Sequence, residues 1–298
     1  MLNPIQRERA EEKLGDINME IGCFALIDPF STLDHQLSRV QGMGFKYADI
    51  TDNHPGGLLG REFGFSATTS LDDNPADLKA LFAKYELEIT SVCAHANLLD
   101  ASSPARYANA EVTKAVKLAH MLGVKDVITT EGEPKSEWGH SLSRKEQVFA
   151  FAEKLIEPVR LASSLGVRVL LEPHGPVSGT IDGMGEVLER LGHSETVGVN
   201  LDTGNSWLAG TDPVEMAKAF RDRIHHVHWK DMSSDWNEKR GKIFGCGMAV
   251  IPLGEGEVDI AGVFDVVRNS PARHSTLEIA GDDAVKASRD YLQKLAAA

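Results

Sequence analysis

Four residues that can bind a metal ion lie at the ends of four apolar segments in the second half of the chain. Glu172 ends the run "VRVLLE", Asp202 ends "VGVNLD", His228 lies in "IHHVHWKD" and Glu278 lies in "HSTLEIAG". An apolar segment excludes charge unless the charge has a partner, so a shared partner is expected. A divalent cation is the simplest partner for three carboxylates and one imidazole.

The alternation of side chains along a strand supports these residues as one set. In the segment 167–172, Val167, Val169 and Leu171 would face one side, and Leu170 and Glu172 the other. The segments that carry Asp202 and Glu278 alternate in the same way. His226 is expected to fill the interior two residues deeper than His228, whereas His225 should point away.

The expected metal ligands are therefore Glu172, Asp202, His228 and Glu278. Oxygen ligands with a single imidazole and no thiolate favour Mn²⁺, with Mg²⁺ or Co²⁺ as alternatives, over a closed structural zinc site. Taken alone, each acidic residue could equally be a helix cap or a surface ion-pair partner.

The elements that must position these residues alternate in eight cycles of a short apolar run and a longer helical pattern. The eight predicted strands span 19–26, 45–50, 88–95, 125–131, 167–173, 197–202, 224–231 and 274–281. Strands separated by helices pair in parallel through right-handed crossovers. Eight such units predict an α/β fold, a closed (β/α)8 TIM barrel with its active site at the carboxyl ends of the strands. An open doubly wound sheet is the structural alternative.

We expect a single barrel domain over 19–298, preceded by a short N-terminal arm over 1–18. The stretch 232–258 after the seventh strand is too long for a simple connection and indicates a lid or a subunit contact.

Several helices have recognisable ends. Ser31 is the expected N-cap of the helix 31–43, Ser143 and Glu146 form a capping box, and Gly166 ends that second helix. Asp212 followed by Pro213 predicts another helix start.

Composition limits the possible functions. The chain has 298 residues, 42% of them hydrophobic, and no apolar stretch of the roughly 18 residues that a membrane span needs. Its charged beginning does not resemble a signal peptide, so a cytoplasmic protein is expected. The net charge of -13 disfavours nucleic acid as a partner. Cys23, Cys93 and Cys246 form no metal-binding or disulfide pattern and are expected to be buried.

Further candidate residues lie at the same ends of the strands. His174 follows Glu172 by two residues on the same face, so it could protonate a leaving group; a histidine bonded to a loop carbonyl is the alternative. The expected substrate contacts, each with an ordinary capping, packing or ion-pair role as its alternative, are His95, Glu131, Asn205, Lys230, Trp138 and Trp207.

The segments "LEPHG", "NLDTGNSWLAGTDP", "HHVHWKD", "PLGEGEVDIAGVF" and "LEI" resemble the xylose isomerase-like barrel superfamily, and the resemblance covers nearly the whole chain after residue 19. That superfamily includes ketose 3-epimerases, inosose dehydratases, hydroxypyruvate isomerase, apurinic endonucleases and oxo-glycoside eliminases. The resemblance implies that Glu172, Asp202, His228 and Glu278 hold a divalent metal, often manganese. It also implies that the two glutamates form the acid/base pair of the epimerases, and that the protein is a homo-oligomer, a dimer or tetramer.

The chain departs from the epimerase pattern at two positions. Asn205 and Ser234 stand where the epimerases usually have a histidine and an arginine. Lys230 follows His228 by two residues, and this spacing of histidine and lysine resembles the dehydratase branch.

The leading hypothesis is a metal-dependent isomerase or epimerase that acts on an unphosphorylated keto sugar in carbohydrate metabolism. In this reaction Glu172 and Glu278 would move a proton next to the carbonyl through an enediolate. A lyase, either an inosose-type dehydratase or a 3-oxo-glycoside eliminase, is the alternative that Asn205, Lys230 and His174 favour. A DNA-repair nuclease would need more histidine ligands and a basic surface, and a catalytically silent sugar-binding protein would not need the ligand set.

Overall fold

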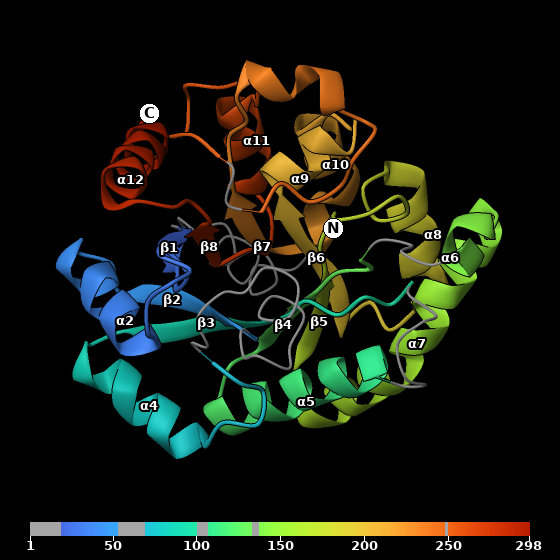
Figure 1. Ribbon diagram of the computed structural model, residues 1–298, viewed down its shortest axis with the longest axis horizontal. Coiled ribbons are helices and arrows are strands. Elements are labelled where there is room, and N and C mark those ends of the chain that lie inside the picture. The colour runs from blue at the N-terminus through green and yellow to red at the C-terminus, as the bar shows by residue number, and fades with distance from the viewer. Residues whose placement is uncertain (1–18, 53–68, 100–106, 133–136, 248–249) are drawn as a thin grey trace, which may run out of the picture.

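The computed structural model describes residues 19–52, 69–99, 107–132, 137–247 and 250–298. Eight parallel strands form a closed barrel in chain order (Figure 1). The first strand, β1 (Glu20–Phe24), pairs with the last, β8 (His274–Leu277), from Glu20 opposite His274 to Cys23 opposite Leu277. This pairing confirms the (β/α)8 barrel, and the open doubly wound sheet is wrong because an open sheet has two unpaired edges. The arm predicted over 1–18 lies outside the described residues.

The barrel strands between these two are β2 (Tyr47–Thr51), β3 (Glu88–Ala94), β4 (Asp126–Thr129), β5 (Arg168–Leu171), β6 (Val197–Asp202) and β7 (Ile224–Trp229). The described α-helices are α2 (Leu33–Gly42), α4 (Pro75–Lys84), α5 (Tyr107–Leu122), α6 (Glu137–Ser141), α7 (Arg144–Leu165), α8 (Ile181–Leu191), α9 (Thr203–Leu208), α10 (Pro213–Phe220), α11 (Ile260–Val267) and α12 (Asp282–Ala296). Two 3₁₀ helices, η1 (Arg221–Arg223) and η2 (Ser234–Lys239), flank β7.

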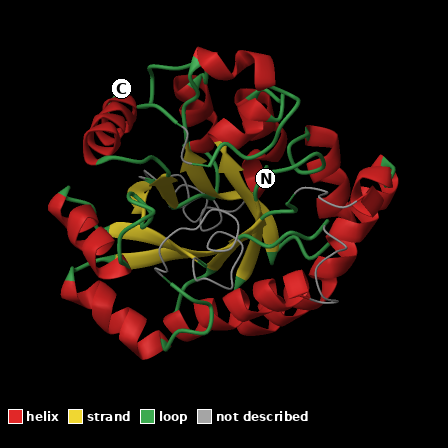
Figure 2. Cartoon of the chain, in the orientation of Figure 1, coloured by secondary structure: helices red, strands yellow, loops and turns green. Residues whose placement is uncertain are grey.

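The helices surround the strands, so the barrel has an outer and an inner apolar layer (Figure 2). Val167, Val169 and Leu171 belong to the large cluster that packs the strands against the helices. A small separate cluster fills the barrel interior and consists of Phe24, Leu26, Cys93, Ile128 and Leu170. The alternation predicted for β5 is therefore confirmed: Leu170 faces inward and its odd-numbered neighbours face the helices.

The ends of α7 and α10 are those that the sequence predicts. Ser143 accepts a hydrogen bond from the backbone of Glu146 while the Glu146 carboxylate accepts one from the backbone of Ser143, which completes the capping box. Gly166 ends α7 in the left-handed conformation, with φ of 70°. Asp212 caps α10, with Pro213 as its first residue.

The predicted cap of α2 is wrong by one residue. Thr32, not Ser31, is the N-cap, because the Thr32 hydroxyl accepts the backbone N–H of His35. Ser31 belongs to the preceding turn, in which its N–H donates to the carbonyl of Asp28.

Most barrel strands end earlier than the apolar runs suggested, and β5 and β8 matter most for the candidate ligands. Because β5 stops at Leu171 and β8 at Leu277, Glu172 and Glu278 are the first residues beyond their strands. Both remain tied to the neighbouring strand: the Glu172 N–H donates to the carbonyl of Thr129 at 3.0 Å, and the Glu278 N–H to that of Trp229 at 3.3 Å. The two carboxylates thus have fixed positions at the carboxyl end of the barrel.

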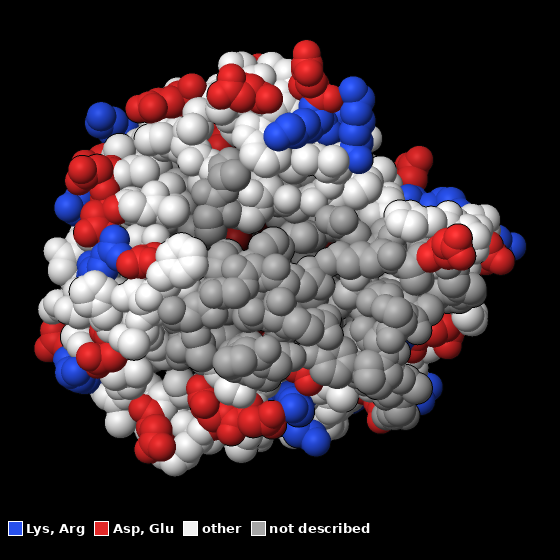
Figure 3. Space-filling model, in the orientation of Figure 1, with Lys and Arg blue, Asp and Glu red and all other residues white. Residues whose placement is uncertain are grey.

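The molecular surface carries mixed charge. Figure 3 shows acidic and basic side chains interspersed around the periphery of one face. All three cysteines are buried and free, as expected. No helix in the described part of the chain is both long and apolar enough to span a membrane.

Candidate metal centre

The barrel brings the four predicted ligands to one place at the carboxyl ends of β5 to β8. The His228 imidazole lies at the centre of the group: its Nδ1 is 3.1 Å from Glu172 Oε2 and 3.2 Å from Glu278 Oε2. Glu172, Asp202 and His228 each offer a ligand atom within 4.8 Å of the others. All four are buried.

These residues fit a divalent ion. Within the described part of the chain, Nδ1 of His228 makes no hydrogen bond, although the two carboxylate oxygens are close to it. Metal–ligand bonds of about 2.1 Å place neighbouring ligand atoms about 3 Å apart, which is the separation found here. Oxygen ligands with one imidazole suit a divalent transition metal or Mg²⁺.

The site has fewer positive than negative charges. Lys230 is buried, and its Nζ lies 3.0 Å from Asp202 Oδ2 and 2.9 Å from Glu278 Oε1. Burial alone would lower the pKa of Lys230, but the charges of Asp202 and Glu278 outweigh burial and raise it well above its usual value. Burial and the charges of Glu172 and Glu278 raise the pKa of Asp202 to about 7 despite Lys230. Lys230 thus leaves part of the carboxylate charge uncompensated, and a divalent ion would compensate it.

Two amide side chains hold Glu172. Asn205 Nδ2 donates to Glu172 Oε1 at 3.0 Å, and Asn200 Nδ2 donates to Glu172 Oε2 at 2.9 Å. Burial alone would raise the pKa of Glu172, but His228 and Lys230 outweigh burial and lower it. The side-chain oxygen Oδ1 of Asn205 accepts the backbone N–H of Cys246, so Asn205 also links Glu172 to the loop after β7.

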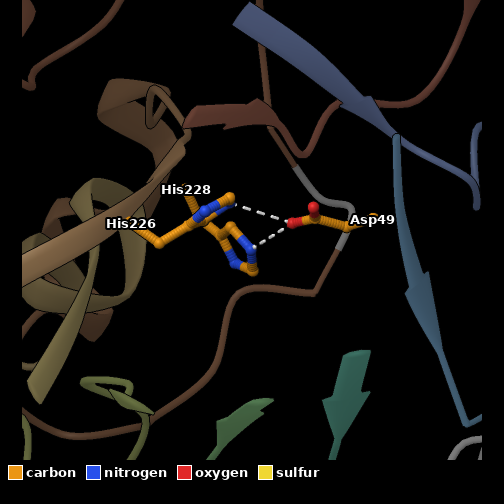
Figure 4. Close-up of side chains that lie close together, drawn as sticks. All are labelled: Asp49, His226 and His228. Atoms are coloured by element: carbon orange, nitrogen blue, oxygen red, sulfur yellow. Dashed lines mark hydrogen bonds and ion pairs between the residues drawn. The ribbon is translucent and has the colours of Figure 1, made fainter. Parts of the chain in front are cut away.

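Asp49, on β2, belongs to the same cluster but was not among the residues selected from the sequence. Its Oδ2 lies 3.1 Å from Nε2 of both His226 and His228, and Figure 4 shows both rings directed at this carboxylate. Burial alone would raise the pKa of Asp49, but the two histidines outweigh burial and hold it well below its usual range. The segment "FKYADI" did contain a signal, because Ala48 and Ile50 pack in the outer core and leave Asp49 on the inward-facing side.

The remaining histidines of the barrel occupy two environments. His226 is buried, as expected, and its Nε2 also lies 3.1 Å from the Thr276 hydroxyl. His225 is only partly buried, and burial lowers its pKa to about 4.

His95 and His174 are neighbours beyond the metal ligands. Their ring centroids are 6.4 Å apart. His95 Nδ1 interacts with the Thr51 hydroxyl at 3.1 Å, and burial lowers its pKa to about 4, so the ring is neutral at physiological pH. The buried Nδ1 of His174 has no hydrogen-bond partner among the residues that the structure describes. Their predicted role as substrate contact and proton donor stays a prediction.

Two other predicted contacts, Glu131 and Trp207, are placed differently. The Glu131 carboxylate accepts the backbone N–H groups of Val177 and Ser178 at 2.6 Å each, so it holds the loop after β5. Burial raises the pKa of Glu131 to about 7. Trp207 is buried in α9 beneath the guanidinium of Arg240, 5.0 Å from its ring centroid. The Trp138 side chain lies outside the described part of the structure. Substrate contact by these residues stays a prediction.

The long segment after β7 folds over this end of the barrel. The Asp231 carboxylate accepts the backbone N–H groups of Met232, Gly254, Gly256 and Val258 at 2.8–3.1 Å. In the glycine-rich stretch 254–258, the backbone N–H groups of Gly254, Gly256 and Val258 therefore point at Asp231, and those of Glu255 and Glu257 donate to the carbonyls of Pro252 and Met232. Earlier in the same segment, the backbone N–H of Cys246 donates to Asn205, as described above. Gly245 lies against the ring of His174, where a Cβ would collide.

Comparisons with known proteins agree with this architecture. The sequence profile of the "Xylose isomerase-like TIM barrel" family matches residues 37–295. An inosose dehydratase from Geobacillus kaustophilus is 26% identical over 227 residues, which cover 68% of this chain and 71% of the relative. This chain also aligns with two further inosose dehydratases, from Clostridium tetani and Clostridium beijerinckii, and each alignment covers 64% of the relative.

Solved structures share the fold. A D-tagatose 3-epimerase-like protein has a TM-score of 0.71 and 20% identity, and the match covers 93% of this chain and 97% of the other. The IOLI protein, solved with a bound zinc atom, has a TM-score of 0.70 and 15% identity, and the match covers 94% of this chain and 98% of the other.

Proposed function

Because the chain belongs to the xylose isomerase-like TIM barrel family, we propose that it is a divalent-metal-dependent enzyme that acts on an oxo-sugar. We further propose that its reaction is an elimination, of the dehydratase or glycoside-eliminase type. The observation that carries this choice is that both carboxylate oxygens of Glu172 accept amide N–H groups.

An epimerase that uses two carboxylates needs both of them free to take or return a proton. The two glutamates here differ in this respect. Glu172 is held by Asn200 and Asn205, and its side chain is 1% exposed. The Glu278 side chain is 9% exposed, and its only contacts with other described side chains are ionic, with Lys230 and His228. Glu172 is therefore suited to a fixed ligand role and Glu278 to proton abstraction. The leading hypothesis from the sequence gave both residues the acid/base role.

Elimination needs one base and one acid. Glu278 would remove the proton from the carbon next to the carbonyl, and the electron pair of that C–H bond would form the new C=C bond. The oxygen substituent on the next carbon would leave with its bonding electrons and take a proton from His174. The products are an enone and either water or the alcohol of a glycoside. When bound, a divalent ion would polarise the substrate carbonyl and stabilise the developing negative charge.

The residues that would hold the ion are Glu172, Asp202, His228 and Glu278. The oxygen-rich ligand set favours Mn²⁺. The IOLI structure contains a zinc atom, which is a property of that protein and does not identify the metal here. Lys230 and the neutral His95 supply polar groups for the sugar hydroxyls. An unphosphorylated substrate is proposed, because the backbone donors of the glycine-rich stretch bind Asp231.

An isomerase or epimerase is the second candidate. One observation favours it: Oε2 of Glu172 and Oε2 of Glu278 lie 3.1 Å and 3.2 Å from the same atom, His228 Nδ1, so both carboxylates border the proposed ion position.

The two reactions give different products. Metal-loaded protein is incubated in D₂O with inososes and with 3-oxo-glycosides, and the enone is followed by its ultraviolet absorbance. The elimination predicts an enone, or a free aglycone, and Glu278→Gln should abolish it. Deuterium in recovered substrate without enone would instead establish the second candidate. If neither product forms with any of these compounds, the proposal is wrong.

A further inference from the structure

Asp49 is a buried carboxylate on β2 that none of the proposed chemical steps uses. It is fully buried, as are His226 and His228 on β7. A buried carboxylate is costly unless it is paired and hydrogen-bonded. Here the Thr90 hydroxyl donates to Oδ1, while Oδ2 faces the two imidazoles, so every contact fixes the orientation of this carboxylate.

The two nitrogens of His228 face different partners. Nε2 lies 3.1 Å from Asp49 Oδ2, and Nδ1 lies 3.1 Å and 3.2 Å from oxygens of Glu172 and Glu278. A neutral imidazole carries one proton, and its other nitrogen offers a lone pair. With the proton on Nε2, the Asp49 contact is a hydrogen bond and Nδ1 faces the carboxylates with its lone pair. That lone pair and the carboxylate oxygens repel one another unless a cation lies between them.

We propose that Asp49 is a positioning residue that holds the His228 proton on Nε2 and so presents Nδ1 to a divalent ion. The inference rests on the metal centre of the proposed function. It adds which nitrogen of His228 binds the ion and which residue selects that nitrogen. A carboxylate that accepts the second N–H of a metal-binding histidine fixes the ring and makes the ligand nitrogen more basic.

The surroundings keep the His228 ring in this orientation. Phe24 packs edge-on against it at a centroid distance of 5.6 Å, with an interplanar angle of 77°. The His226 ring packs against it at 5.4 Å and 87°. Asp49, Phe24 and His226 come from three different strands, so the barrel itself sets the angle at which His228 meets the other ligands.

The protonation pattern can be measured on the unmodified protein. With ¹⁵N-labelled histidine and Zn²⁺ as a diamagnetic probe, long-range ¹H–¹⁵N spectra distinguish a protonated nitrogen from a metal-bound one. The expected spectrum has a protonated Nε2 and a metal-bound Nδ1 for His228, with one ion per chain. A protonated Nδ1, or a second ion bound by Asp49, would overturn the inference.

Substitutions test the role of Asp49 directly. Asp49→Asn removes the charge at nearly constant volume and should weaken Mn²⁺ or Zn²⁺ binding about 10- to 100-fold in calorimetric titrations. Thr90→Val removes one hydrogen bond to Asp49 and should cause a smaller loss, which keeps the test open if Asp49→Asn does not fold. Both effects are independent of turnover.

Asp126→Asn is the matched control, because Asp126 is a buried carboxylate at the opposite end of a barrel strand, paired with Arg168 at 2.7 Å. It should not change the affinity for the ion. Unchanged affinity in Asp49→Asn, or an equal loss in Asp126→Asn, would contradict the positioning role. If the unmodified protein binds no ion at all, the proposed function fails instead, so the two failures are distinguishable.

Discussion

Replacement of Lys230 by methionine tests whether the site lacks positive charge. Lys230 contacts Asp202 at 3.0 Å and Glu278 at 2.9 Å, and all three side chains are buried. Removing one partner of a buried ion pair leaves an uncompensated charge and typically costs about 3–5 kcal/mol. For a protein of this size, that loss lowers the melting temperature by about 6–20 °C.

A divalent ion should restore much of this loss. In the unmodified protein a bound divalent ion and the Lys230 ammonium group would repel each other, because both would be cations beside Asp202 and Glu278. Lys230→Met removes this repulsion, so the variant should bind Mn²⁺ at least about tenfold more tightly and gain more stability from it.

The assay is thermal unfolding followed by circular dichroism, first with a chelator and then across a Mn²⁺ titration. Lys84→Met is the matched control, because the Lys84–Asp34 pair is exposed and should contribute little. The reasoning is refuted if Lys230→Met and the unmodified protein have the same melting temperature in chelator, or if Mn²⁺ stabilises both proteins equally.

Further predictions concern other parts of the site. Gly245→Ala should displace the His174 ring and lower kcat. Gly247 is the control, because it has the same left-handed conformation but open space around it among the described residues, so Gly247→Ala should lower stability only. Thermal melts and turnover of the same samples separate the two effects. Burial lowers the pKa of His225 to about 4. Between about pH 4 and 6.5 the folded state therefore binds fewer protons than the unfolded state, so the protein loses stability as the pH falls through this window. With chelator present in both samples, His225→Gln should remove about 1 kcal/mol of this loss in urea titrations, because solvent screens a partly exposed group; parallel pH profiles of the two proteins would contradict this. Glu172→Gln should abolish tight Mn²⁺ binding in calorimetry, and undiminished affinity would remove Glu172 from the ligand set.

Local patterns were sufficient for the fold and for the assembly of the main cluster. Glu172 and Glu278 follow strands whose alternation is readable, and parallel strands in a barrel must bring their carboxyl ends to one rim. The capping box of Ser143 and the stop at Gly166 depend only on residues within one helix.

Long-range contacts were not readable in the same way. Asp49 lies far from His228 in the chain, and only the barrel register brings the two together. Glu131 ends a strand just as Glu172 does, yet it binds the backbone of the neighbouring loop. A residue type at a strand end does not reveal whether a cation or a backbone N–H will meet it. The cap of α2 shows the same limit at short range, because Ser31 and Thr32 have equivalent hydroxyls and the turn through Asp28 decides between them.

The closure of β8 onto β1 has a consequence for biosynthesis. Glu278 directly follows the residue that pairs with Cys23, and Asp49 lies one strand beyond β1. A nascent chain that has emerged from the ribosome only as far as β7 can supply Glu172, Asp202 and His228 but not the fourth carboxylate. Full affinity for the ion would then arise only after β8 has emerged and has paired with β1.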